Sequence, residues 1–145
     1  MRKFLFIFSA ILLLAAFFFG YLMGGSYGAR PQEDMSKIDI GVAEDYPVGT
    51  IKPWPAEKII IFSDKDGIYA ISTRCTHLGC TLKFNNNKAT CPCHGAMFTM
   101  DGIVLKGPAK QNLPWFEIQQ GQAGHLYVDK SKTVPAGTKC KFDNK

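Results

Sequence analysis

Apolar and polar positions divide the chain into two parts of different character. Phe4 to Met23 is a run of twenty uncharged, mostly apolar residues. At about 1.5 Å per residue, a helix of that length spans the roughly 30 Å hydrocarbon core of a membrane. Signal peptides usually have shorter apolar runs, of about 7 to 15 residues. We therefore expect an uncleaved anchor over residues 1–24, with cleavage near the following small residues as the alternative.

The flanks of this apolar run predict its orientation and a tether. Arg2 and Lys3 directly precede it, and positive charges of this kind stay on the cytoplasmic side, so the rest of the chain is expected to face outward. Residues 24–36 contain several Gly and Ser residues, a composition typical of a flexible linker. We expect this tether to act as a hinge only if the function requires the outer domain to move.

Beyond Pro31 the pattern changes to short runs rich in β-branched and aromatic residues, separated by turn residues. No stretch of a dozen residues there has helical periodicity. The predicted strands are Lys37 to Val42, Lys58 to Ser63, Ile68 to Thr73, Thr81 to Phe84, Ile103 to Leu105, Trp115 to Gln119 and His125 to Asp129. A hairpin turn is expected at Asp64-Lys65-Asp66-Gly67. The fold class is therefore all-β and antiparallel over residues 37–130, followed by a basic C-terminal tail at 131–145.

Charge excludes a nucleic-acid-binding function. The formal net charge is +5, but Arg2, Lys3 and Arg30 flank the apolar run, and without them the surplus of basic over acidic residues is two. No basic stripe interleaved with aromatic residues is present, as a nucleic-acid surface would need.

Cysteine and histidine residues cluster in two short boxes. Four of the five cysteines and two of the three histidines lie in Cys75-Thr76-His77-Leu78-Gly79-Cys80 and Cys91-Pro92-Cys93-His94-Gly95-Ala96. Structural zinc sites usually keep like ligands together in pairs, whereas each box here mixes Cys with His. A set of two cysteines and two histidines divided between two loops suits a [2Fe–2S] cluster in which imidazoles replace two thiolates on one iron.

The two boxes, C-T-H-L-G-C and C-P-C-H-G, resemble those of the Rieske iron–sulfur proteins. The resemblance implies a Rieske-type antiparallel β-sandwich with a two-loop cluster-binding subdomain. It implies that Cys75 and Cys91 bind one iron and that His77 and His94 bind the other. It also implies a disulfide between Cys80 and Cys93. Leu78, and Pro108 in a proline loop, would contact the cofactor. That disulfide is typical of the quinol-oxidising members and requires an oxidising compartment.

The resemblance also implies a function: the electron-transfer subunit of a cytochrome bc-type quinol–cytochrome c oxidoreductase, which is not a complete enzyme alone. The protein would be a single-pass protein of a bacterial inner membrane, with its cluster domain on the periplasmic or outer face. His94 would be the catalytic residue that contacts the quinol. The implied partners are a cytochrome b subunit, a c-type cytochrome and the quinol, in a dimeric complex.

Two alternatives and one departure from the family pattern accompany this interpretation. The small Rieske subunit of a molybdenum oxidoreductase such as arsenite oxidase has similar boxes and contacts no quinol. A Rieske ferredoxin of an oxygenase is disfavoured by the apolar run and by Cys80 and Cys93.

Ala96 and Phe98 stand where the family commonly has Ser and Tyr, whose hydroxyls bond to a bridging sulfide and a ligand thiolate. Their absence predicts a lower potential and favours menaquinol as donor. The remaining His125 and Cys140 are expected to have no metal role.

Overall fold

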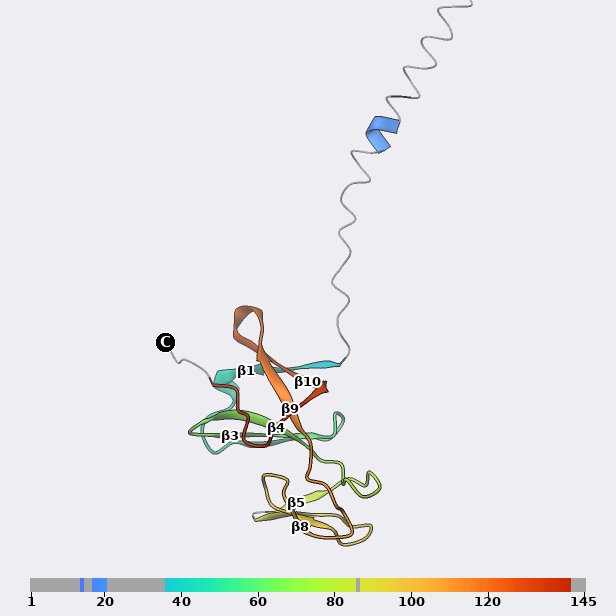
Figure 1. Ribbon diagram of the computed structural model, residues 1–145. Coiled ribbons are helices and arrows are strands. Elements are labelled where there is room, and N and C mark those ends of the chain that lie inside the picture. The colour runs from blue at the N-terminus through green and yellow to red at the C-terminus, as the bar shows by residue number, and fades with distance from the viewer. Residues whose placement is uncertain (1–13, 15–16, 21–35, 86, 142–145) are drawn as a thin grey trace, which may run out of the picture. The chain divides into compact units, whose positions relative to one another are not determined.

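The computed structural model describes residues 14, 17–20, 36–85 and 87–141. The chain divides into two units, Met1–Glu33 and Asp34–Lys145. In the first unit, Leu14 and residues 17–20 are helical and exposed. None of the helices among the described residues is both long and apolar enough to span a bilayer. The predicted anchor and tether fall mostly outside the described residues (Figure 1).

The second unit consists of antiparallel β-strands, which confirms the predicted all-β class. The strands are β1 (Lys37–Val42), β2 (Ile51–Trp54), β3 (Ile59–Asp64), β4 (Gly67–Ser72), β5 (Lys83–Asn85), β6 (Lys88–Thr90), β7 (Met97–Phe98), β8 (Val104–Lys106), β9 (Trp115–Gln120) and β10 (His125–Val134), with short 3₁₀ turns η1 (Ala43–Asp45) and η2 (Gln122–Gly124). A six-stranded sheet has the order β1-β10-β9-β4-β3-β2, and a four-stranded sheet has the order β5-β6-β7-β8.

Strand positions agree with the sequence prediction to within two residues at each end, except for four strands. The strands β2, β6 and β7 were not predicted: β2 contains Pro53, which sequence patterns treat as a strand breaker, and the other two have three and two residues. The strand β10 continues to Val134, past residue 130, where we expected the domain to end. The hairpin turn between β3 and β4 lies where expected, with Asp64 paired to Gly67.

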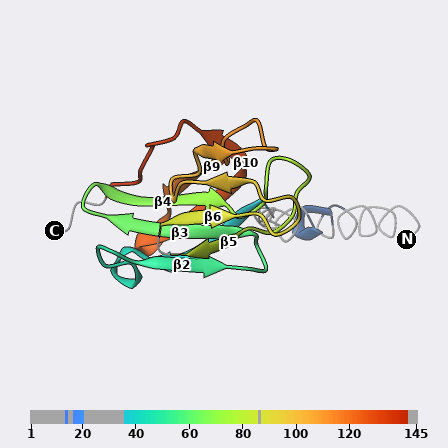
Figure 2. The same ribbon diagram turned by 90° about the horizontal axis from the view of Figure 1, so that it is seen from below.

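Successive side chains of β3 and β4 point to opposite faces of the sheet and pack in two separate cores. On one face they pack with residues of β1 and β10, so these strands of the same sheet face each other. The buried residues of this core include Ile40, Ile59, Ile61, Ile68, Ala70, Leu126 and Val128. The alternate set, including Ile60, Phe62, Tyr69 and Ile71, shares its core with the four-stranded sheet. Figure 2 shows β5 and β6 lying across β3 and β4 on this second face.

Stacked aromatic residues of the larger sheet hold the smaller sheet through hydrogen bonds. The Tyr69 ring stacks on Trp115, with 4.5 Å between centroids, and on Phe62, with 5.2 Å. The Trp115 indole N–H donates to the Asp101 carbonyl at 2.9 Å, and the Tyr69 hydroxyl donates to the Asp101 carboxylate at 3.3 Å. Because Asp101 lies in the turn between β7 and β8, these bonds fix the small sheet against the large one.

His125 and Cys140, which lie outside the two boxes, contact neighbouring strands. The His125 Nδ1 lies 2.9 and 3.1 Å from the two carboxylate oxygens of Asp39 on the neighbouring strand. Cys140 is a free, half-buried cysteine whose backbone exchanges two hydrogen bonds with Ile68 of β4, and burial raises the pKa of its thiol. The segment expected to be a tail therefore pairs with the β3–β4 hairpin.

Candidate metal centre

Each of the two boxes forms a loop with the same backbone hydrogen bonds. The first loop connects β4 to β5, and the second connects β6 to β7. In each loop the Gly amide donates to the carbonyl of the first cysteine, and that cysteine's amide donates to the carbonyl five residues later. In the first loop these bonds run from Gly79 to Cys75 at 2.8 Å and from Cys75 to Cys80 at 2.8 Å. In the second they run from Gly95 to Cys91 at 3.0 Å and from Cys91 to Ala96 at 2.8 Å. The φ angles of Gly79 and Gly95, 79° and 73°, explain why glycine occupies these positions.

Backbone N–H groups in each loop point at the sulfur of its first cysteine. The donors are His77 and Leu78 for Cys75, and Cys93 and His94 for Cys91. Both cysteines are only 2% exposed, and their side chains hydrogen-bond each other. Burial raises the pKa of Cys75. Burial also acts to raise the pKa of Cys91, but the backbone N–H groups outweigh it, so this pKa lies below its ordinary value. Amide donors of this kind stabilise a thiolate, the form that binds metal.

The two histidines of the boxes lie next to each other. The rings of His77 and His94 are 4.9 Å apart between centroids and perpendicular to each other. His77 Nδ1 is buried and has no hydrogen-bond partner among the residues that the structure describes. Such a nitrogen is unfavourable unless something binds it. Two inward thiols, two imidazoles and a buried nitrogen that needs a partner fit a [2Fe–2S] cluster with mixed ligands. His94 is exposed, which leaves part of its ring open to solvent.

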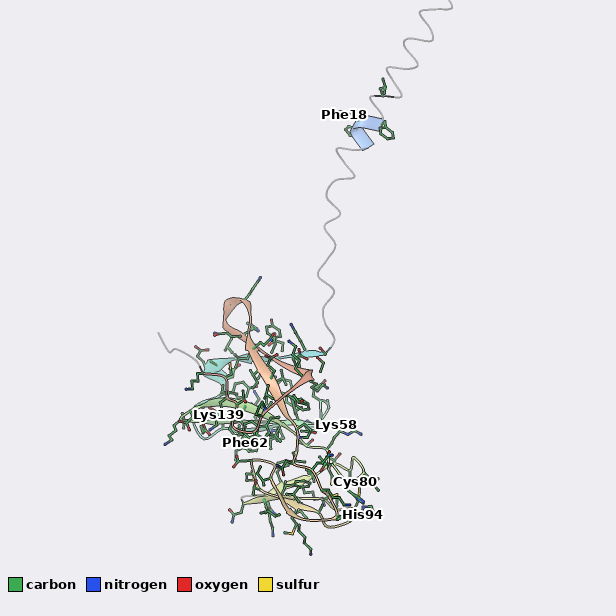
Figure 3. All side chains as sticks on the ribbon, in the orientation of Figure 1. Phe18, Lys58, Phe62, Cys80, His94 and Lys139 are labelled. Carbon is green, nitrogen blue, oxygen red and sulfur yellow. A yellow bond between two sulfur atoms is a disulfide. The ribbon has the colours of Figure 1, made fainter. Side chains whose placement is uncertain are left out.

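A disulfide links the two loops. Cys80 of the first box bonds to Cys93 of the second, with a Cα–Cα distance of 6.6 Å. The Sγ atoms of Cys80, Cys91 and Cys93 all lie within 4.8 Å of one another. The pairing that the resemblance implies is therefore present, and of the four box cysteines it leaves Cys75 and Cys91 free to bind metal. Figure 3 shows Cys80 and His94 close together on one side of the small sheet.

We expect the disulfide to stabilise the metal-free protein more than the metal-loaded one. The chain-entropy model gives about 3 kcal/mol for a bridge over 13 residues. A bound cluster joins the same two loops, so it already restricts the unfolded chain in the same way. Denaturant titration of Cys80→Ser/Cys93→Ser should show the full loss only without metal, and Cys140→Ser serves as the control. Equal losses with and without metal would contradict this expectation.

A third segment covers the first loop. The hydroxyl of Thr76 donates to the Gln111 carbonyl at 2.6 Å, and Ala109 is buried in the core that contains Cys75 and Cys91. Pro108 lies between these contacts and β8 and is exposed. Leu78 is 71% exposed, so its side chain is available for contact with another molecule. The role of Gln111 was not visible in the sequence, because a backbone carbonyl acceptor carries no residue signature.

Comparison with known proteins shows which family this chain resembles. The Rieske [2Fe-2S] domain family matches residues 36–117. The chain is 33% identical over 95 residues to the cytochrome b6-f complex iron-sulfur subunit of Chlorobaculum tepidum, an alignment covering 63% of this chain and 52% of the relative. The subunit of the same name from Synechococcus elongatus is 35% identical over 101 residues, with 62% and 56% of the two chains covered.

A solved structure also resembles the chain. The crystal structure of the cyanobacterial plasma membrane Rieske protein PetC3 from Synechocystis PCC 6803 aligns with a TM-score of 0.41 at 30% identity, covering 63% of this chain and 97% of that one. The chain spans about half the length of the first curated relatives that it matches. The family match covers more than half of the present sequence and includes both boxes. The chain therefore belongs to the Rieske [2Fe-2S] domain family, and its cofactor is a Rieske-type [2Fe–2S] cluster.

Proposed function

We propose that this chain is the Rieske electron-transfer subunit of a cytochrome bc-type or b6-f-type complex, which accepts an electron and a proton from quinol and passes the electron to a c-type cytochrome. The observation that carries the proposal is an exposed histidine, His94, on a loop closed by the Cys80–Cys93 disulfide. Relatives named as iron-sulfur subunits of cytochrome b6-f complexes support it. In this proposal Cys75 and Cys91 hold one iron, and His77 and His94 hold the other.

The chemistry follows from the ligand types and from exposure. When bound, the cluster supplies a one-electron acceptor whose potential lies between about −150 and +300 mV, because two neutral imidazoles replace two thiolates. His94 is exposed, so its ring can contact a quinol. The positive charge of bound ferric iron would favour loss of the remaining ring N–H proton to solvent, and the nitrogen freed in this way could accept a hydrogen bond from a quinol hydroxyl and then its proton. Leu78 and Pro108 are also exposed, and in this proposal they offer apolar surface for the quinol ring and the wall of its pocket.

The remaining features of the sequence support a location at a membrane. We propose that residues 1–24 anchor it in a bacterial inner membrane and that residues 24–36 let the cluster domain move between a cytochrome b subunit and a c-type cytochrome in a dimeric complex. The apolar run and Arg2-Lys3 support the anchor and its orientation. The disulfide supports an outer, oxidising location for the cluster domain.

The proposal is tested by purifying the full-length protein from its own membranes in a mild detergent. We expect b-type and c-type haem to co-purify with it, and menaquinol to reduce the cluster anaerobically, as followed by electron paramagnetic resonance. A molybdenum-containing partner together with a cluster that no quinol reduces would instead support the arsenite-oxidase type of subunit.

A further inference from the structure

A basic groove lies beside the first box loop. It has a volume of about 430 Å³, and its lining includes Glu57, Lys58, Ser72, Arg74, Phe116 and Lys130. Three of these side chains are cationic and one is anionic. The groove lies on strands and turns of the large sheet, outside the set of side chains assigned to the cluster.

The charges in this groove are only partly neutralised. The Lys130 ammonium lies 2.6 Å from the Glu57 carboxylate and so pairs with the one acidic side chain of the lining. Neither Lys58 nor Arg74 forms an ion pair with any residue in the described part of the chain. Two exposed positive charges therefore remain available to an external anion.

Backbone hydrogen bonds hold the segments that carry these two cations next to each other. The Thr73 amide donates to the Lys58 carbonyl at 2.9 Å, so the Lys58 turn is bonded to the residue that precedes Arg74. The Arg74 amide donates in turn to the Ser72 hydroxyl at 3.1 Å. Both cations are thus presented from backbone that is hydrogen-bonded in place, not from a free tail.

Arg74 connects the groove to the metal centre. It directly precedes Cys75 in the chain, and its guanidinium packs on the first box loop: a terminal nitrogen lies 3.0 Å from the position that a Cβ on Gly79 would take. Figure 3 shows Lys58, Cys80 and His94 following one another along the same side of the molecule. A molecule bound in the groove is therefore held beside the first box loop.

We propose that the basic groove around Lys58 and Arg74 docks the acidic face of a protein that exchanges electrons with the metal centre; this inference rests on the proposed function. Charge complementarity selects the partner, because two uncompensated cations attract an acidic surface and steer its approach. The Phe116 ring adds apolar contact in the groove. Contact with the box loop favours a redox protein over a lipid headgroup, because electron transfer requires the partner to lie close to the cluster.

Binding of poly-L-glutamate to the full-length, cluster-loaded protein in detergent tests this proposal. We expect calorimetry to show salt-sensitive binding by the wild type and an affinity at least about tenfold lower for Lys58→Gln/Arg74→Gln. The control Lys65→Gln/Lys83→Gln changes the net charge equally at exposed lysines elsewhere and should bind within about twofold of the wild type. Bound poly-L-glutamate should also slow oxidation of the cluster by hexacyanoferrate(III), which takes one electron, and should do so less in the double variant.

Three outcomes would overturn the inference. Equal weakening in the control would mean that net charge alone attracts the polyanion. Binding of phosphatidylglycerol vesicles through Lys58 and Arg74, without binding of poly-L-glutamate, would make the groove a membrane contact. Unchanged affinity in the double variant, with an unchanged melting temperature, would remove the site. None of these measurements uses quinol, so failure of the proposed function would be seen separately, as a wild-type cluster that quinol does not reduce.

Discussion

Replacing His94 by Gln should abolish quinol oxidation by the assembled complex. The substitution removes an imidazole that we assign both to iron and to the quinol proton, and general-base groups contribute about a hundredfold or more to rate. The His94 ring is exposed and packs edge-on against His77, so Gln can take its place without disturbing a buried core. Quinol–cytochrome c reductase activity and iron content should be measured on the same preparation.

His125→Gln is the matched control for this experiment. It changes the same residue type in the same domain but removes only an exposed contact with Asp39. Exposed pairs of this kind contribute about 0.2 to 1 kcal/mol to stability. We therefore expect activity within about twofold of the wild type. Comparable losses from the two substitutions, or normal turnover with His94→Gln, would contradict the assignment of His94.

The local geometry of the metal centre was predictable from the sequence because short boxes determine their own loops. A glycine four residues after the first cysteine permits the positive φ that closes each loop, and Gly79 and Gly95 occupy those positions. The Cys80–Cys93 pairing came from the family resemblance, since spacing alone allows other pairings. The packing of Gln111 against Thr76 could not be predicted, because it joins segments 35 residues apart through a backbone carbonyl.

The parts of the fold that escaped prediction depend on contacts between different segments of the chain. Strand β7 has only two residues, Met97 and Phe98, and it exists because β6 and β8 pair with it from both sides. The basic groove combines Lys58, Arg74 and Lys130 from three separate strands or turns, so no local pattern reveals it. Strands β3 and β4 were predictable because each is a short, nearly continuous apolar run, a pattern typical of a strand buried on both faces.

A second large effect is expected from the last residue of the second box and from a residue just after it. Ala96 and Phe98 are fully buried in the core that contains Cys75 and Cys91, where the family commonly has Ser and Tyr. Hydrogen bonds from those hydroxyls to sulfur favour the reduced state, because it carries the extra negative charge. If each bond contributes about 1.4 kcal/mol, it is worth roughly 60 mV for one electron. Their absence lowers the potential, which is why we propose menaquinol as the donor.

Ala96→Ser/Phe98→Tyr should therefore raise the cluster potential by about 120 mV, as measured by redox titration followed by electron paramagnetic resonance. The matched control is Ala70→Ser/Phe62→Tyr, which adds the same two hydroxyls at buried positions of β4 and β3 in the large sheet, outside both boxes. A new buried hydroxyl that finds no acceptor costs about 1 to 3 kcal/mol, so the control should lose stability with little change in potential. In the test variant the hydroxyls gain sulfur acceptors, so the cluster potential should rise and the loss of stability should be smaller than in the control. A wild-type potential already near the family's upper limit of roughly +300 mV, or a test variant whose potential does not move, would remove both the tuning argument and the choice of menaquinol.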